Sequence, residues 1–192
     1  MFDKKNYPKL GIYESLLKTW NEKLNLVANS TLENAWERHF VDSLQLAEIL
    51  KDKDAFIYDL GAGAGFPSLV LSEQGYKNVY AVEKLAKKAK FLEEVKKELK
   101  LPVNILNTNI SKLKINKKPV FIARAFASLV KIFDITATHF RLNPEYVLLK
   151  GERWKEEVEE AKKFYDFDLK TKPSITSDKS MILIINNVRK KK

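Results

Sequence analysis

The fold is decided by Asp59-Leu60-Gly61-Ala62-Gly63-Ala64-Gly65-Phe66-Pro67, a stretch in which three glycines alternate with other residues. The apolar run over 55–60 predicts a short buried strand that ends in a tight turn. Residues 67–74 predict a short helix directly after the turn. Because glycine lets the backbone turn sharply and lets a ligand approach closely, the stretch predicts a ligand-binding loop between a strand and a helix.

Strand and helix patterns alternate after this loop. Further strands are predicted over 78–83, 103–107, 120–123 and 146–150, helices over 85–99, 129–140 and 153–163, and two closing strands over 164–170 and 181–186. This alternation predicts an α/β, Rossmann-like fold with a mostly parallel sheet and helices on both faces. The two closing strands are near each other in sequence, which predicts that they pair antiparallel at the C-terminus.

The first fifty residues instead predict helices. One apolar stripe at spacings of three and four consists of Leu10, Tyr13, Leu17, Trp20 and Leu24. Ser30-Thr31-Leu32-Glu33 has the pattern of a capping box and predicts the start of a second helix, with a break near Asp42. The chain is thus predicted to be one domain, 1–192, with a helical extension over 1–50, a core over 55–187 and a basic tail over 188–192.

Composition limits the class of protein. The chain has 192 residues, 45% of them hydrophobic, which is enough for one packed domain. It has no apolar run long enough for a membrane span and no signal peptide, which predicts a cytoplasmic protein without a membrane partner. The absence of cysteine excludes disulfides and thiolate metal sites, and we predict no metal.

The net charge of +10 favours a polyanionic partner such as nucleic acid. Two observations weaken this argument. Only five of the 35 basic residues are arginine, and Arg189 to Lys192 carry four of the ten net charges at the chain end. Charge alone therefore suggests a kind of partner and says nothing about the fold.

Glu83 ends the second predicted strand, eighteen residues after Gly65. A carboxylate at this place can accept hydrogen bonds from both ribose hydroxyls of an adenosyl group. The glycine spacing is G-x-G-x-G rather than the G-x-G-x-x-G of dinucleotide sites, and Pro67 removes an N–H donor from the helix end that would hold pyrophosphate. The pattern therefore favours S-adenosyl-L-methionine. Asp59 could face the methionyl ammonium or accept nearby backbone N–H groups.

Several segments resemble one known family. They are Trp20-Asn21 with Asn25-Leu26, Arg38-His39-Phe40-Val41-Asp42-Ser43, Asp59 to Pro67, Phe91-Leu92, Arg124-Ala125-Phe126-Ala127-Ser128 and Lys150-Gly151. In this order and spacing the chain is similar to the bacterial small-subunit ribosomal RNA methyltransferases that modify guanine N7 in the 530 loop, the glucose-inhibited division protein B family. The R-H-x-x-D-S and R-A-F-A-S segments are more specific to that family than the glycine loop is.

The resemblance implies a class I methyltransferase fold, an S-adenosyl-L-methionine cofactor, and 16S ribosomal RNA or the 30S subunit as partner. Nothing in the sequence demands more than a monomer. The cofactor residues expected from the loop and the resemblance are Asp59, Gly61, Gly63, Gly65, Phe66, Glu83, Ile110, Ser111 and Arg124. The chain departs from the family pattern at Ser68, where glycine is usual, and at Ser111, where an acid is frequent. Its acid after the second strand is Glu83 where aspartate is common.

Arg124 is predicted to position the cofactor carboxylate or a substrate phosphate in bidentate fashion, or else to form an ion pair within the fold. His39 and Asp42 lie three residues apart on one helix face, where they could shape the substrate pocket or dock the N-terminal helices. Arg38 and Lys150 are further candidates for substrate contact. Three aromatic residues are candidates for stacking on a base, although a place in the core is favoured for each of them: Phe66, Phe126 and Trp154.

Methyl transfer to guanine N7 needs no general base, because N7 carries a lone pair and no proton. The enzyme's task is then mainly orientation. Three other functions stay open at this point: a methyltransferase for another RNA or a small molecule, a nicotinamide-dependent oxidoreductase, and a non-enzymatic RNA-binding domain.

Overall fold

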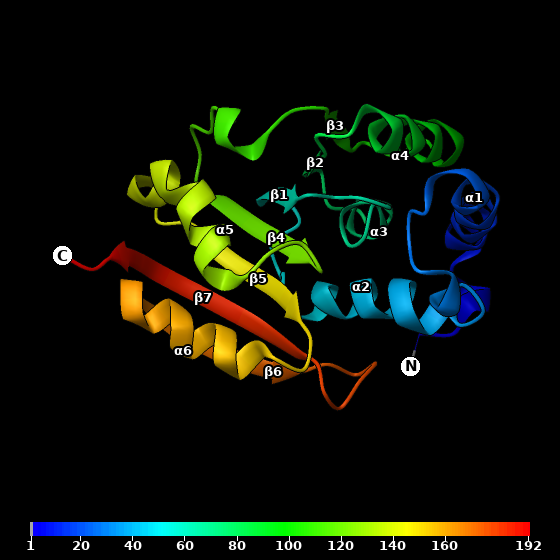
Figure 1. Ribbon diagram of the computed structural model, residues 1–192. Helices are drawn as coiled ribbons and strands as arrows, with labels where there is room; N and C mark the ends of the chain where they lie inside the picture. The colour runs from blue at the N-terminus through cyan, green and yellow to red at the C-terminus, as the bar shows by residue number, and fades with distance from the viewer. Residues whose placement is uncertain (1) are drawn as a thin grey trace.

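The computed structural model describes residues 2–192, and residue 1 of the predicted extension lies outside the described residues. A seven-stranded sheet has the order β3-β2-β1-β4-β5-β7-β6 (Figure 1). The strands are β1 (Phe56–Leu60), β2 (Asn78–Val82), β3 (Asn104–Leu106), β4 (Pro119–Arg124), β5 (Glu145–Lys150), β6 (Tyr165–Pro173) and β7 (Met181–Lys190). The first five are parallel, and β7 runs antiparallel to both β5 and β6, which confirms the predicted sheet.

Helices cover both faces of the sheet (Figure 1). They are α1 (Pro8–Leu24), α2 (Asp42–Leu44), α3 (Ser68–Glu73), α4 (Ala86–Leu99), α5 (Leu129–Thr136) and α6 (Trp154–Phe164). On β1, Ile57 packs with α1 to α4, whereas its neighbour Tyr58 belongs to the cluster under α5 and α6. This alternation follows from the two-residue period of a strand, and it gives the protein two apolar layers.

The N-terminal extension packs as predicted through α1, where Leu10, Tyr13 and Leu17 are buried. Its second helix differs from the prediction. Ser30 is exposed and caps nothing, and a 3-10 turn over Asn29–Thr31 precedes a helix that begins near Trp36. Ser30 lies inside that 3-10 turn, several residues before the helix, so the capping box does not form. The hydroxyl of the next residue, Thr31, bonds the Ala28 carbonyl and the His39 ring.

No break occurs at Asp42. A π-helix over Trp36–Val41 continues into α2 and then into a 3-10 helix over Gln45–Glu48. Only the helix type changes at this residue. Short π-helical turns occur frequently at functional sites, and this one contains Arg38 and His39.

At the other end, β7 continues to Lys190, so most of the predicted basic tail lies in the sheet. Val188 is buried, and Arg189 and Lys190 pair with Asp166 and Tyr165 of β6. Because the apolar side chain of Val188 is buried, the sheet continues into a segment whose charged residues had predicted a solvated tail. Within residues 2–192, no helix has both the length and the apolar character needed to cross a membrane.

The sheet topology places the glycine loop at a particular edge. β1 lies between β2 and β4, so the order of strands reverses beside it. Ligands in such sheets bind at the carboxyl ends of the strands next to this reversal. The glycine loop follows β1 and Arg124 ends β4, so both lie at this edge.

Candidate active site

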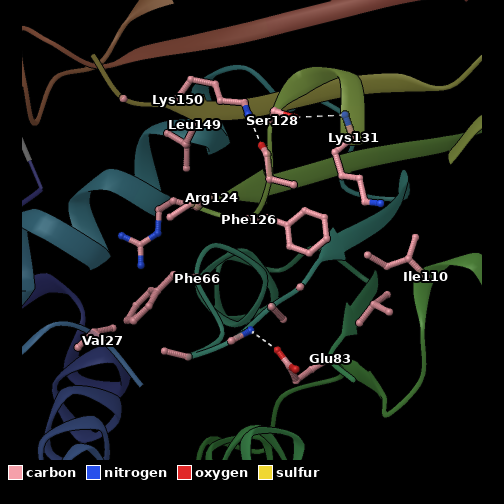
Figure 2. Close-up of a pocket in the computed structure, with 18 of the residues that line it drawn as sticks. Val27, Phe66, Glu83, Ile110, Arg124, Phe126, Ser128, Lys131, Leu149 and Lys150 are labelled. Carbon is pink, nitrogen blue, oxygen red and sulfur yellow. Dashed lines mark hydrogen bonds between the residues drawn. The ribbon is translucent and has the colours of Figure 1, made fainter. Parts of the chain in front are cut away.

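A cavity of about 1880 Å³ opens at this edge (Figure 2). Its walls come from the loop after β1, the ends of β2 and β4, the N-terminal helices and the hairpin loop between β6 and β7. Sites for small molecules usually measure about 300–1000 Å³. The cavity therefore has room for a cofactor together with part of a larger partner.

The cavity collects most of the predicted site residues. Those that line it are Gly61, Gly63, Phe66, Glu83, Ile110, Ser111 and Arg124 from the cofactor set, and Arg38, His39, Asp42 and Lys150 from the substrate set. Asp59 and Gly65 lie outside its lining. The fold thus brings together side chains from widely separated parts of the sequence.

The glycine loop is held from both sides. Its Gly61 and Ala62 N–H groups donate to the Val82 carbonyl at 3.0 and 2.9 Å, and the Ala64 carbonyl accepts the Tyr13 hydroxyl of α1. Gly65 has φ +87°, and a Cβ there would lie 2.5 Å from the Tyr13 hydroxyl oxygen. At Gly63 (φ +56°) the nearest atom to such a Cβ is 3.7 Å away. Gly65 therefore serves packing, whereas Gly63 leaves the loop backbone open to a ligand.

Glu83 follows β2 and is buried at the cavity wall. One carboxylate oxygen accepts the Gly63 N–H at 3.0 Å (Figure 2). The other accepts the Leu85 N–H at 2.8 Å. Each carboxylate oxygen can accept a further hydrogen bond. The side chain thus fixes the loop and keeps acceptor capacity for hydroxyl groups, so its structural and ligand-binding roles are compatible.

Asp59 lies behind the loop, fully buried. Its Oδ2 accepts the Ser68 N–H at 3.2 Å, at the first turn of α3. Burial raises the pKa of Asp59 to about 6, opposed by hydrogen bonding from Ser68 and by the Arg124 charge. The carboxylate occupies the helix end that a pyrophosphate would need, which is a second argument against a dinucleotide.

The raised pKa of Asp59 predicts a pH effect on stability. The folded group holds its proton between pH 3.8 and about 6 while the unfolded one releases it. Its contribution is therefore fully present below pH 3.8 and is lost as pH rises through 6, by about 3 kcal/mol. Urea unfolding of the wild type and Asp59→Asn from pH 4 to 7 should show this fall in their difference. A pH-independent difference would contradict the prediction.

The three candidate stacking residues are in different environments. Phe66 is 3% exposed and stacks on Tyr13 at 5.1 Å and on His39 at 5.2 Å between ring centroids. Phe126 is 37% exposed, and its ring covers Gly61 at the cavity (Figure 2). Trp154 is half-buried at the start of α6, beside Lys155. Of the three, Phe126 has the ring best placed to meet a ligand.

Ile110 and Ser111 begin a 3-10 helix on the far wall of the cavity. The Asn109 side chain accepts the Ser111 N–H and its hydroxyl, both at 3.1 Å. The Ser111 side chain is thus used locally to shape the turn. Leu85, half exposed on the same cavity, was missed by the sequence reasoning, although it lies only two residues after Glu83.

Arg124 faces the N-terminal segment. Its Nη1 donates to the Arg38 carbonyl at 2.9 Å and to His39 Nδ1 at 2.8 Å, and lies 3.6 Å from Asp42 Oδ2. Its guanidinium lies 4.9 Å from the centre of the Phe66 ring. The ion pair within the fold is therefore present, and the cation also lines the cavity.

Asp42 and Lys150 hold the cavity walls together. Asp42 Oδ1 accepts from Gln45 at 2.9 Å and from the Thr176 hydroxyl at 2.7 Å, which ties the β6–β7 loop to the N-terminal helix. Lys150 Nζ donates to the Ala127 carbonyl at 2.6 Å and pairs with Glu157 at 2.7 Å. Both side chains therefore have structural partners at the edge of the cavity.

Sequence reasoning missed further charged residues on the cavity. They are Lys84, Lys88, Lys131, Arg153, Glu156, Glu157 and Glu160. Nothing in the sequence distinguishes these lysines from the many others in the chain. Their common position appears only when the carboxyl ends of the strands are assembled.

Solved structures share this fold. The chain is similar to magnesium protoporphyrin IX methyltransferase from Synechocystis PCC 6803 with bound SAM, with TM-score 0.60 and 12% identity over 92% of this chain and 97% of that one. It is also similar to the PH0226 protein from Pyrococcus horikoshii OT3, with TM-score 0.61 and 13% identity over 91% and 99%. The sheet order, the glycine loop and the acid after β2 define an S-adenosylmethionine-dependent methyltransferase.

The chain belongs to the rRNA small subunit methyltransferase G family, whose model matches residues 6–183. It is 37% identical over 182 residues to the ribosomal RNA small subunit methyltransferase G of Rickettsia prowazekii (strain Madrid E), covering 95% of this chain and 94% of that protein. The protein of that name from Orientia tsutsugamushi (strain Ikeda) is 38% identical over 95% and 91%. The predicted family is confirmed, and the oxidoreductase alternative is rejected.

Proposed function

We propose that this protein transfers a methyl group from S-adenosyl-L-methionine to guanine N7 in the 530 loop of 16S ribosomal RNA. The observation that best supports this proposal is that one cavity is lined by the glycine loop and Glu83 together with Arg124 and the N-terminal helices. Family membership supports ribosomal RNA as the substrate. The size of the cavity supports a substrate that enters beside the cofactor.

In this proposal a few residues bind the cofactor. Glu83 accepts hydrogen bonds from the ribose hydroxyls, and Leu85 and Ile110 supply apolar walls for adenine. The open backbone at Gly63 lets the cofactor lie against the loop. When bound, S-adenosyl-L-methionine supplies a methyl group activated by its sulfonium.

The remaining residues orient the substrate base. Guanine N7 needs no proton removed, and the buried His39 fits this requirement, because burial and the charges of Arg124 and Arg38 lower its pKa to about 3. His39 is therefore unprotonated at neutral pH, and a pKa this low also makes it a weak base, as a reaction that needs no proton removed allows. Phe126 offers its exposed ring for stacking on the base. Stacking would help to align N7 with the methyl carbon, and this alignment is the source of the rate enhancement.

A labelling experiment tests the proposed function. The purified protein is incubated with tritiated S-adenosyl-L-methionine and naked 16S RNA, modified 30S subunits, or 30S subunits from a strain that lacks the modification. Label is expected on unmodified substrate alone, at a guanine N7 in the 530 loop. Label at another nucleotide would support another RNA substrate, and absence of cofactor binding by calorimetry would reject a methyltransferase.

Two cations at the cavity are expected to contact RNA phosphates. Lys131 and Arg153 are exposed and line the cavity. Replacing both with alanine should weaken RNA binding and reduce the slope of log affinity against log salt by about 1.5, since each phosphate contact contributes about 0.7–0.9. Filter binding at several salt concentrations measures this.

The matched control is the double replacement of Lys162 and Lys163, which removes the same charge. These lysines pair with Glu159 and Glu160 along α6 at 2.9 and 2.6 Å. The control should leave the salt slope nearly unchanged. Equal slopes for the two double variants would refute the proposed phosphate contacts.

We further propose that residues 1–192 form one domain that acts as a monomer in the cytoplasm, where 30S subunits are found. The contacts of the extension support the single domain, because Tyr13 and Asp42 bond to the glycine loop and to the C-terminal hairpin. Light scattering at micromolar concentration should give the mass of a single chain. A mass of two chains would reject the monomer.

A further inference from the structure

Arg124 is held through one nitrogen only. Every hydrogen bond and ion pair that its side chain makes with residues 2–192 goes through Nη1, to the Arg38 carbonyl, His39 Nδ1 and Asp42. The side chain is 17% exposed, and neither Nε nor Nη2 is fully buried without a hydrogen-bond partner. These two donors therefore have no partner among residues 2–192 and are not fully buried, on a residue that lines the cavity (Figure 2).

The hydrogen bonds of His39 fix its tautomer. The Thr31 hydroxyl donates its proton to the Ala28 carbonyl at 2.7 Å, so its oxygen can only accept from His39 Nε2, 2.8 Å away. The ring proton then lies on Nε2, and Nδ1 is left as an acceptor for Arg124 at 2.8 Å. The lowered pKa of His39 agrees with this neutral form. A protonated ring would place an N–H against the guanidinium.

The surroundings restrict both side chains further. The His39 ring stacks on Phe66 with an interplanar angle of 26°, and the guanidinium of Arg124 lies over the same phenyl ring. The acceptors for Nη1 come from residues 38, 39 and 42 of one continuous helical segment. A single element of the N-terminal extension therefore sets the direction of an arginine at the end of β4.

We propose that His39 is a positioning residue for Arg124: as a neutral acceptor fixed by Thr31, it holds Nη1 and turns Nε and Nη2 toward an anionic group of the ligand. The anion is a carboxylate or a phosphate, from the methionyl end of the cofactor or from the RNA backbone. A planar guanidinium edge suits both groups, provided that its orientation is fixed. This inference rests on the proposed function, to which it adds a role for the extension.

A double-mutant cycle tests the coupling. His39→Phe keeps a ring on Phe66 but loses the acceptor, and His39→Asn restores an acceptor oxygen. We expect His39→Phe to lower kcat/KM on unmodified 30S subunits about 10-fold or more, and His39→Asn to recover most of it. In the Arg124→Ala background, His39→Phe should change kcat/KM less than about 2-fold. Independent, multiplying effects of the two substitutions would overturn the proposal, as would full activity of His39→Phe.

Two ligands identify the anion. S-adenosylhomocysteine carries the amino-acid carboxylate, and methylthioadenosine lacks it. If Arg124 binds the carboxylate, His39→Phe weakens calorimetric binding of the first ligand only. If Arg124 binds phosphate, both ligands bind as in the wild type while KM for RNA rises. Unchanged ligand affinities together with an unchanged KM would overturn the proposal.

Nitrogen NMR of the imidazoles tests the geometry without activity. The chain has only two histidines, and His139 is buried away from the cavity lining, so His139→Asn assigns the spectrum and serves as the matched control. His39 should show the neutral Nε2–H form from pH 5 to 8 and a moved Nδ1 signal in Arg124→Ala. The other tautomer would overturn the positioning role. A wild type that gives this spectrum but methylates no RNA would instead reject the proposed function.

Discussion

Replacing Glu83 with glutamine is expected to weaken S-adenosyl-L-methionine binding about 100-fold. The carboxylate accepts the Gly63 and Leu85 N–H groups through its two oxygens. In glutamine one of those oxygens becomes an NH₂ donor, which faces a backbone donor and can no longer accept the proton of a ribose hydroxyl. The loss of two charge-assisted hydrogen bonds corresponds to about 3 kcal/mol. Isothermal calorimetry measures the affinity.

Two controls separate ligand binding from loop disorder. Glu94→Gln makes the same chemical change on the exposed face of α4 and should bind the cofactor normally. A 2′-deoxyadenosyl analogue should lose less affinity than the natural cofactor on going from wild type to Glu83→Gln, because it lacks one of the hydroxyls. Equal losses for both ligands would mean that Glu83 acts only on the loop. Wild-type affinity in Glu83→Gln would contradict both roles.

The loop and its acid could be predicted because they are local in sequence. Strand 55–60, the glycines and the strand before Glu83 carry their own patterns, and the observed strands Phe56–Leu60 and Asn78–Val82 differ from them by one residue at an end. Periodicity and glycine spacing describe what each segment does by itself. The order of the parallel strands then follows from the usual rules for connections.

Contacts distant in sequence could not be predicted in this way. The capping pattern at Ser30 failed because residues 29–31 fold into a 3-10 turn, which the contact of Thr31 with His39 holds against the following helix. Asp59 could face either the cofactor or the backbone until α3 placed the Ser68 N–H beside it. Phe66 could serve as a stacking platform or as core, because nothing local shows that Tyr13 covers it. In each case a tertiary partner decided between two chemically reasonable roles.

The same limit applies to the N-terminal extension. Its apolar stripe predicts a helix that packs on the core, and Tyr13 does so. The stripe gives no sign that Tyr13 would bond the Ala64 carbonyl of the glycine loop, or that Asp42 would join the extension to Thr176. The extension is therefore part of the site's framework, which explains why residues from it and from β4 have to be tested together.

Arg124→Ala is expected to lower kcat/KM on unmodified 30S subunits at least about 100-fold while costing about 2 kcal/mol of stability. The stability cost comes from the lost Nη1 contacts with Arg38 and His39, whereas Asp42 keeps its bonds to Gln45 and Thr176. The activity loss should be larger because Nε and Nη2 are proposed to serve the ligand and not the fold. Arg124→Lys should lie between, since an ammonium keeps the charge without the planar edge.

Arg141→Ala, an exposed arginine on the 3-10 helix Ala137–Leu142, is the matched control and should change neither quantity. Methyl transfer and urea unfolding are measured on the same preparations of all three variants. An Arg124→Ala protein whose activity falls only by the fraction that is unfolded would show that the arginine serves packing alone. If Arg124→Ala is folded but inactive and Arg124→Lys has intermediate activity, the free edge of the guanidinium is needed for activity. Packing and charge alone do not explain why activity falls from the wild type to Arg124→Lys and again to Arg124→Ala.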